Sequence, residues 1–136
     1  MSVETKNRYI EAVGRRKTAI ARVRITPGAK ATTFLVNDKD VKEYFVTEDL
    51  QMIAQEAIIK SEVGEKFTVT VHVLGGGIHA QAEAVRHGLS RTLVERDEAV
   101  KNTLKKLGFL KRDSRQVERK KFGLKKARKA PTWSKR

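Results

Sequence analysis

The residues of this sequence that are best suited to chemistry are the cations of its C-terminal end. Residues 111–136 read KRDSRQVERKKFGLKKARKAPTWSKR, in which 12 Lys or Arg accompany two acids, Asp113 and Glu118. This stretch therefore holds +10 of the formal net charge of +14 that the chain carries at pH 7. Clustered cations neutralise phosphate groups, and the rings of Phe122 and Trp133 can stack on bases. A pI near 10.3 makes nucleic acid the leading partner.

The same stretch is not expected to fold without a partner. Its large apolar side chains are only Val117, Phe122, Leu124 and Trp133, too few to offset the backbone entropy lost on ordering the segment. Repulsion between like charges adds to the deficit. The stretch is therefore either a solvated, mobile end or a segment that a polyanion orders. The aromatic residues among the cations favour the second interpretation.

A second group of cations lies near the N-terminus. Residues 9–13 predict a short strand, residues 14–17 a turn, and residues 18–26 a longer strand with clear alternation, in which Ile20 lies on the otherwise polar side. The pattern places five cations on one side of a hairpin with no acid between them: Arg15, Arg16, Lys17, Arg22 and Arg24. These residues form either a solvated sheet face or, because no counter-charge is present, a phosphate-binding face.

A glycine run, Gly75-Gly76-Gly77, separates a predicted strand from a predicted helix over residues 78–96. Such a run can bring backbone amides close to a phosphate, or it can be a sharp turn without a ligand. The nucleotide-binding patterns GxxxxGK[ST] and GxGxxG are absent. Gly88 within the helix indicates that RNA or the sheet approaches the backbone there. Three polar residues of the helix are expected to face outward: Arg86, His87 and Arg91.

No set of residues predicts catalysis. The three histidines (His72, His79, His87) lack the spacing of zinc ligands, and the sequence has no cysteine. A binding or structural protein without a cofactor or metal is therefore favoured over an enzyme. A membrane partner is not expected, because there is no long apolar span and no basic amphipathic helix with a Trp or Leu face. The N-terminal MSVETKNRYI lacks an apolar signal region, so secretion is not expected.

The elements that must position these residues are an α+β set. Further strands are predicted over residues 34–36 and 67–74, where Phe67, Val69, Val71 and Val73 give one apolar face that a helix layer should cover. Helices are predicted over residues 40–45, 48–60, 78–96 and from 97 or 98 to 107, with Gly108 as the stop. This organisation predicts one globular RNA-binding domain over residues 1–110 and an extended basic tail over residues 111–136.

Four stretches, in matching order, carry a resemblance to a known family. They are GRRKTAIARVRI (14–25), VNDKDVKEYF (36–45), GGGIHAQAEAVRHGLSRTL (75–93) and GFLKRDSRQVERKKFGLKKARKAPTWSKR (108–136). The chain resembles the small-subunit ribosomal protein nine family of bacterial type over nearly its whole length. Where the family usually has a Ser-Gly-Gln-Ala-Gly pattern after the glycine run, this chain has His79, Ala80 and Glu83. Trp133 stands where a phenylalanine is common.

The resemblance implies a particular fold. It is an α+β fold in which helices back a mixed sheet, with a left-handed βαβ crossover as in ribosomal protein S5 domain 2, followed by the basic tail. Most crossovers of this kind are right-handed. Other RNA-related functions on this fold remain open, namely a free RNA-processing protein such as the protein part of ribonuclease P. A small-molecule kinase would need a nucleotide loop and a catalytic acid, which the sequence does not show.

The resemblance also implies a structural constituent of the small ribosomal subunit, located on cytoplasmic ribosomes and not forming homo-oligomers. Its partners would be small-subunit rRNA of the 3′ (head) domain, P-site tRNA and neighbouring proteins of the head. The tail would thread through rRNA, and its last residues, Ser134, Lys135 and Arg136, would reach the anticodon stem-loop of the P-site tRNA. Together with the cations and glycines described above, the expected rRNA-binding residues are Arg15, Arg16, Lys17, Arg22, Arg24, Gly75, Gly76, Gly77, Arg86, His87, Arg91, Arg112, Arg115, Arg119, Lys120, Lys121, Lys125, Lys126, Arg128 and Lys129.

Overall fold

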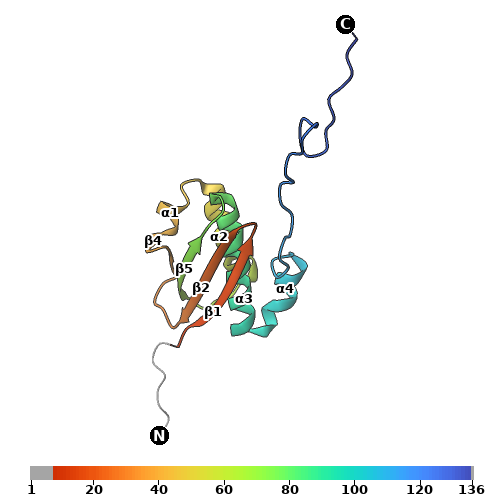
Figure 1. The fold of residues 1–136 in the computed structure, drawn as a ribbon. Helices are drawn as coiled ribbons and strands as arrows, with labels where there is room; N and C mark the ends of the chain where they lie inside the picture. Colours follow the sequence, from red (N-terminus) through yellow and green to blue (C-terminus); the bar gives the residue numbers. More distant parts are fainter. Residues whose placement is uncertain (1–7, 136) are drawn as a thin grey trace.

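Five strands and their covering helices make up the body of the protein in the computed structural model, which describes residues 8–135 (Figure 1). The strands are β1 (Ile10–Arg16), β2 (Ala19–Pro27), β3 (Thr33–Val36), β4 (Lys39–Asp40) and β5 (Phe67–Leu74). The helices are α1 (Val41–Tyr44), α2 (Glu48–Ser61), α3 (Ile78–Arg96), the 3₁₀ turn η1 (Glu98–Val100) and α4 (Lys101–Lys106).

The sheet is mixed, with the strand order β1-β2-β5-β3-β4. Strand β2 pairs antiparallel with both β1 and β5, whereas β3 runs parallel to β5. The connection between the two parallel strands passes through β4, α1 and α2. The predicted α+β class with a mixed sheet backed by helices is therefore confirmed. One local prediction was wrong, because Asp40 ends strand β4 and the short helix α1 begins only at Val41.

Strict alternation in β2 and β5 creates the inner face of the sheet. Ala19, Ala21, Val23 and Ile25 are fully buried, while Phe67, Val69, Val71 and Val73 are at most 2% exposed. Helix α3 lies across β1 and β2 on this face, and α2 packs against α3. The opposite face of β2 and β5 is open to solvent, as the exposed Ile20, Leu74 and His72 indicate. The predicted apolar faces are confirmed.

Two glycines let strand β1 touch helix α3. A Cβ atom on Gly88 would lie 2.7 Å from Val23 Cγ2 and 2.9 Å from the backbone nitrogen of Gly14, and a Cβ on Gly14 would overlap the backbone of α3. The predicted turn over residues 14–17 was wrong, because residues up to Arg16 belong to β1 and the turn is Lys17-Thr18, with Lys17 at φ 53°. The sequence predicted that either RNA or the sheet approaches Gly88, and the structure shows that the sheet does.

The start of the basic stretch is fixed by the end of α4. Gly108, at φ 79°, donates its N–H to Lys105 O at 3.1 Å, and Phe109 donates to Leu104 O at 3.1 Å. This pair of hydrogen bonds is the Schellman arrangement that ends helices. Phe109 is buried and Leu110 packs against the core, so the body extends to the start of the basic stretch.

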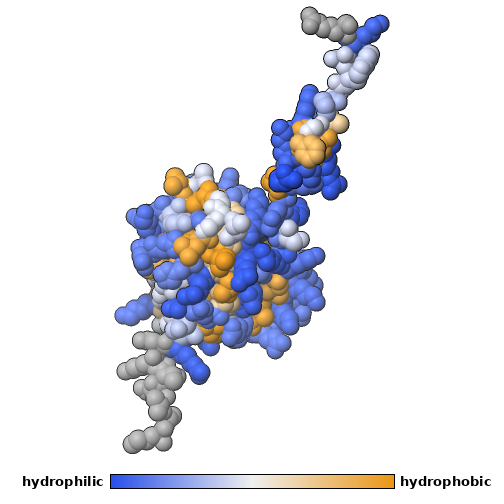
Figure 2. Space-filling view, viewed as in Figure 1, coloured by the Kyte–Doolittle hydropathy of each residue, from blue (hydrophilic) through white to orange (hydrophobic). Residues whose placement is uncertain are grey.

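Beyond Leu110 the described chain forms no helix or strand, and after Arg115 it runs away from the body (Figure 1). Figure 2 shows this segment as mainly hydrophilic, with a small hydrophobic group in its middle part. No helix within residues 8–135 is both long enough and apolar enough to cross a membrane.

Candidate nucleic-acid interface

The open face of the sheet carries three of the predicted cations: Arg15, Arg22 and Arg24. Antiparallel pairing places Arg22 opposite Val13 and Arg24 opposite Glu11. Arg15 lies two residues beyond Val13 on the same face and is opposite Ile20. Lys17 lies at the turn and is exposed like Arg15. The expected cationic surface of the hairpin is therefore present, although it does not include all five residues.

The expectation that this face holds no acid was wrong. Glu11 Oε2 lies 2.6 Å from Arg24 Nε, and Glu11 Oε1 lies 3.4 Å from Arg22 Nε. The hydrogen bond to Glu11 raises the pKa of Arg24. Arg24 also stacks over the Tyr9 ring at 4.6 Å from its centroid. Eleven or more residues separate these partners in the sequence, so only the strand register brings them together.

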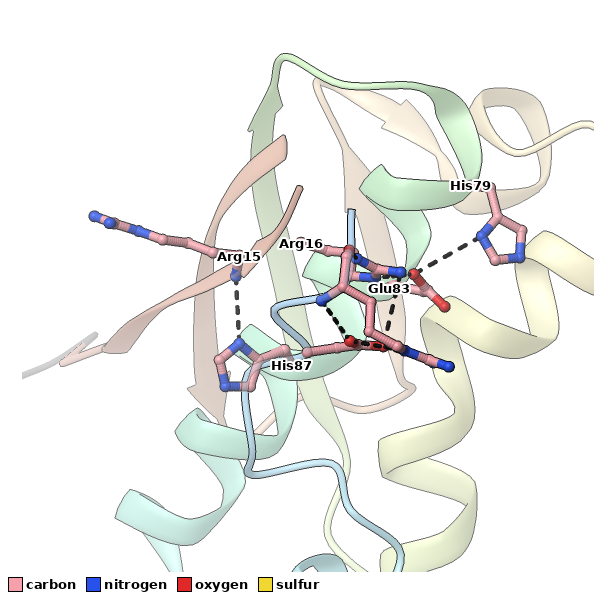
Figure 3. A network of polar contacts seen from close by, with 7 residues as sticks. Arg15, Arg16, His79, Glu83 and His87 are labelled. Carbon is pink, nitrogen blue, oxygen red and sulfur yellow. Dashed lines mark hydrogen bonds and ion pairs between the residues drawn. The ribbon is translucent and has the colours of Figure 1, made fainter. Parts of the chain in front are cut away.

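Arg16 points to the opposite side of the sheet from Arg15, because successive residues of a strand alternate. Its side chain is only 12% exposed, and its Nε donates to Glu83 Oε2 of α3 at 2.7 Å (Figure 3). The same guanidinium lies 3.7 Å from Asp113 Oδ2 and donates to the carbonyl oxygen of Arg115. Arg16 therefore connects the sheet, helix α3 and the start of the basic stretch.

Asp113 and Arg115 complete this junction. Arg115 makes a two-point contact with the carboxylate of Asp113, at 3.1 Å from Nε to Oδ1 and 2.8 Å from an η-nitrogen to Oδ2. The side chain of Arg115, then its backbone N–H and then Arg16, lower the pKa of Asp113 well below its ordinary range. Asp113 is therefore ionised at neutral pH and balances the positive charges of Arg16 and Arg115. Arg115 has a raised pKa for the same reason.

The three polar residues of α3 all contact protein groups. Arg86 and His87 are half-buried, so the expectation that they face outward was wrong, whereas Arg91 is exposed as expected. Arg86 lies 3.0 Å from Glu56 Oε2 and stacks over the Phe109 ring at 4.8 Å. Arg91 donates to the carbonyl oxygen of Val13 at 2.6 Å. These contacts tie α3 to α2, to the end of α4 and to β1.

His87 lies beside the same junction. Its Nδ1 accepts a hydrogen bond from the Arg15 N–H at 3.3 Å. Burial lowers the pKa of His87, and the positive charges of Arg91, Arg112 and Arg86 add to this, whereas a hydrogen bond to the Leu110 backbone opposes it. His87 is therefore neutral at pH 7 and acts as a hydrogen-bonding group, not as a cation.

The glycine run forms a sharp turn against the β1–β2 hairpin. Gly75 and Gly76 have φ angles of 74° and 66°, which favour glycine. A Cβ on Gly75 would lie 2.7 Å from Thr18 O, so the run packs directly on the hairpin turn. Gly77 is exposed and precedes the first residue of α3. The run thus lies next to Lys17, and its geometry is explained by the turn alone.

Within the basic stretch, Glu118 organises a loop that is visible in Figure 1. Its Oε2 lies 2.9 Å from Arg128 Nε, and its Oε1 pairs with Lys121 Nζ. The Lys125 N–H donates to Lys129 O at 2.8 Å and closes the loop. Around this loop three large apolar side chains face solvent: Val117 (89% exposed), Phe122 (99%) and Trp133 (81%).

Most predicted tail residues are exposed. Those with exposed side chains are Arg112, Arg115, Arg119, Lys120, Lys125, Lys126, Arg128, Lys129, Ser134 and Lys135, whereas Lys121 is half-buried. Arg136 lies outside the described residues. Residues 8–135 contain no group of three or more His, Cys, Asp or Glu that could hold a metal ion.

A comparison with protein families agrees with this arrangement. The model of a family described as ribosomal protein S9/S16 matches residues 14–136. The match covers the hairpin from Gly14 onward, the glycine run, helix α3 and the whole basic stretch. Because it spans most of the chain, the chain belongs to the ribosomal protein S9/S16 family, whose members are rRNA-binding proteins of the small ribosomal subunit.

Proposed function

We propose that this protein is a structural constituent of the small-subunit head, where it binds the 3′ domain of the rRNA and reaches the P-site tRNA. In this proposal residues 1–110 form a globular RNA-binding body, with the left-handed crossover expected between β3 and β5. Residues 111–136 form an extended tail that passes through folded rRNA. The setting is the cytoplasmic ribosome, the protein acts without forming homo-oligomers, and its neighbours include other proteins of the head.

The observation that carries the proposal is the concentration of exposed cations without an acidic partner in the short tail. Within residues 8–135, five arginines of the body pair with Glu11, Glu56, Glu65 or Glu83, although Arg15, Lys17 and several surface lysines of the body are unpaired as well. Several tail cations are exposed and make no ion pair in the described part of the chain: Arg112, Arg119, Lys120, Lys125, Lys126 and Lys129. Such cations gain most from neighbouring phosphates.

Recognition in this proposal relies on shape. Tail cations contact phosphates and set the position of the chain, without reading base sequence. The exposed rings of Phe122 and Trp133 are available to stack on unpaired bases. On the body, Arg15, Lys17 and Arg22 with the nearby glycine run Gly75–Gly77 form the second contact. Arg16, Arg86, His87 and Arg91 support that contact by holding β1 and α3 in place.

The tRNA contact is tested by removing the last residues. Deletion of residues 134–136 should leave small-subunit assembly intact and weaken P-site tRNA binding, because Lys135 and Arg136 no longer neutralise phosphates of the anticodon stem-loop. Binding is measured on purified small subunits programmed with messenger RNA. The double substitution Lys135→Arg and Arg136→Lys keeps both charges and serves as the control, with near-normal affinity expected. Unchanged tRNA affinity after the deletion would exclude this role.

A further inference from the structure

The outward side of helix α2 carries apolar side chains that nothing in the body covers. Met52 is 64% exposed and Ile59 is 58% exposed, and both lie on the same side of the helix, two turns apart. With Asp49, Ile53, Glu56 and Lys60 they line a shallow groove. The opposite side of α2 buries Ala54 and Ala57 within the core. The helix is therefore apolar on both sides, although within residues 8–135 only one side is packed against other elements.

The sequence segment that carries this groove has a charge opposite to that of the rest of the chain. Residues 43–65 contain six acids and a single cation, Lys60, which gives −5 in a chain of +14, so the remaining residues carry +19. The acids are Glu43, Glu48, Asp49, Glu56, Glu62 and Glu65. Arg86 and Arg96, which lie outside the segment, balance Glu56 and Glu65, so the segment and these two arginines together carry −3. A phosphate backbone is repelled by such a segment, since exposed charges act over about 8–10 Å at physiological salt. RNA is consequently a poor occupant for this groove.

The edge of the groove is held in a fixed arrangement. Glu56 is half-buried and lies 3.0 Å from an η-nitrogen of Arg86, whose guanidinium in turn stacks on the buried Phe109. Glu56 is thereby anchored to α3 and to the end of α4. Asp49 at the other end of the groove is exposed. The groove thus has an exposed acid at one end, Asp49, and an exposed cation at the other, Lys60. Its apolar centre and the exposed acids of the surrounding segment suit a protein that brings an apolar side chain with Lys or Arg nearby.

We propose that the groove on α2 is a docking surface for a second, basic protein of the same subunit. Complementary charge selects the occupant: the acidic segment attracts a cationic protein surface, while Met52 and Ile59 supply the apolar centre of the contact. The inference rests on the proposed place of this chain among neighbouring proteins of the head. The inference adds that one neighbouring protein contacts the groove on α2. It also adds that this protein must present an apolar side chain on a basic surface.

The test uses the full-length chain inside assembled small subunits. The photoreactive amino acid p-benzoylphenylalanine replaces Met52, subunits are purified and irradiated, and the crosslinked product is identified by mass spectrometry. The expected product joins position 52 to a ribosomal protein of net positive charge. The same photoreactive residue at Ile20, which is 47% exposed on the cationic sheet face, is the control and should crosslink mainly to rRNA.

A second measurement checks that the groove itself makes the contact. The exposed positions tolerate polar residues, so the double variant Met52→Glu and Ile59→Glu should fold and still sediment with small subunits. A crosslinker at the neighbouring exposed position Asp49 should then give at least about fivefold less of the protein product than in the unsubstituted groove.

The outcomes separate the two proposals. A chain that fails to sediment with small subunits contradicts the proposed function as a whole. A chain that sediments normally, but whose position 52 crosslinks to rRNA, to an acidic protein or to no macromolecule, overturns the docking surface alone. An undiminished protein crosslink in the double glutamate variant overturns it as well.

Discussion

Arg16 shows how one residue can fix the geometry of a segment that it does not belong to. Its guanidinium joins Glu83 of α3 to Asp113 and Arg115, the first turn of the basic stretch, from a site that is largely withdrawn from solvent. The neighbouring His79 Nδ1 lies 3.8 Å from the carboxylate of Glu83. Glu83 thus anchors the root of the tail through Arg16.

We predict that Glu83→Gln loosens this root. The substitution removes the carboxylate nearest to Arg16, and partly buried charged hydrogen bonds contribute about 1–2 kcal/mol. Amide hydrogen exchange at residues 111–116 should become faster in the free protein, with a fall of similar size in the free energy of unfolding. His79→Gln is the control, because His79 is mainly exposed and should have a small effect. Unchanged exchange in Glu83→Gln would show that the contact does not hold the tail.

His87 gives a prediction for pH. Its pKa is lowered in the folded protein, chiefly by burial, so below its ordinary pKa of about 6.5 the unfolded chain binds more protons than the folded one. Stability should therefore decrease as the pH falls from 7.5 to 5.5. The groups facing the imidazole are Arg86, Arg91, Arg112 and the Leu110 backbone.

Chemical denaturation at both pH values measures this effect. The variant His87→Gln should show a smaller change in unfolding free energy between the two pH values than the natural protein. His72→Gln, which changes an exposed histidine on the open sheet face, should keep the full change. An equal pH dependence in the natural protein and His87→Gln would contradict the assignment.

At the scale of elements, the contact between β1 and α3 determines where the cationic hairpin lies. This contact depends on Gly14 and Gly88, whose missing side chains let strand and helix meet. We predict that Gly88→Ala lowers the free energy of unfolding by about 1–3 kcal/mol, because the added methyl group meets Val23 and the backbone of Gly14. This happens even though alanine is the better helix former by about 1 kcal/mol.

Gly64→Ala is the matched control for this substitution. A Cβ atom at Gly64 has no other atom within 4 Å, and the residue lies in the loop between α2 and β5. The Gly64→Ala variant should unfold at a midpoint temperature within a few degrees of that of the natural protein. The Gly88→Ala variant should unfold at a clearly lower temperature. Equal melting of the two variants would mean that the contact at Gly88 is not tightly packed.

The elements themselves were largely predictable, whereas their side-chain partners were not. Strict alternation in residues 18–26 and 67–74 reflects burial of one sheet face, and the structure shows β2 and β5 there. The pairing of Glu11 with Arg24 depends on the strand register, and that of Arg16 with Asp113 joins residues 97 positions apart. Gly14 was misinterpreted because a glycine that permits a turn and one that permits close packing look alike in a sequence.

At the scale of the whole molecule, charge is strongly divided. Residues 111–136 carry a net charge of +10, whereas residues 43–65 carry a net charge of −5. The Schellman arrangement at Gly108 and the junction at Arg16 direct the positive segment away from the body (Figure 1). In the proposed function the body is therefore a nearly neutral anchor, and the tail makes the main electrostatic contact with rRNA.

We predict that binding to small-subunit rRNA depends steeply on salt. If the tail neutralises about 8 phosphates, log K should fall with log[salt] with a slope of about −6 to −7. A chain truncated after residue 110 should give a much flatter line, because residues 1–110 carry only +4. Filter binding at several salt concentrations measures both slopes. Equal slopes for the two chains would show that the tail makes no net phosphate contacts.

The central claim is that the cationic tail lies within folded RNA, and a density map of small subunits containing this chain tests it most directly. The account predicts ordered density for residues 111–135, with nucleotides beside Lys125, Lys126 and Lys129 and a base or ribose against Phe122 or Trp133. A tail that extends into solvent in an otherwise well-resolved head, with no nucleotide beside these residues, would contradict the account.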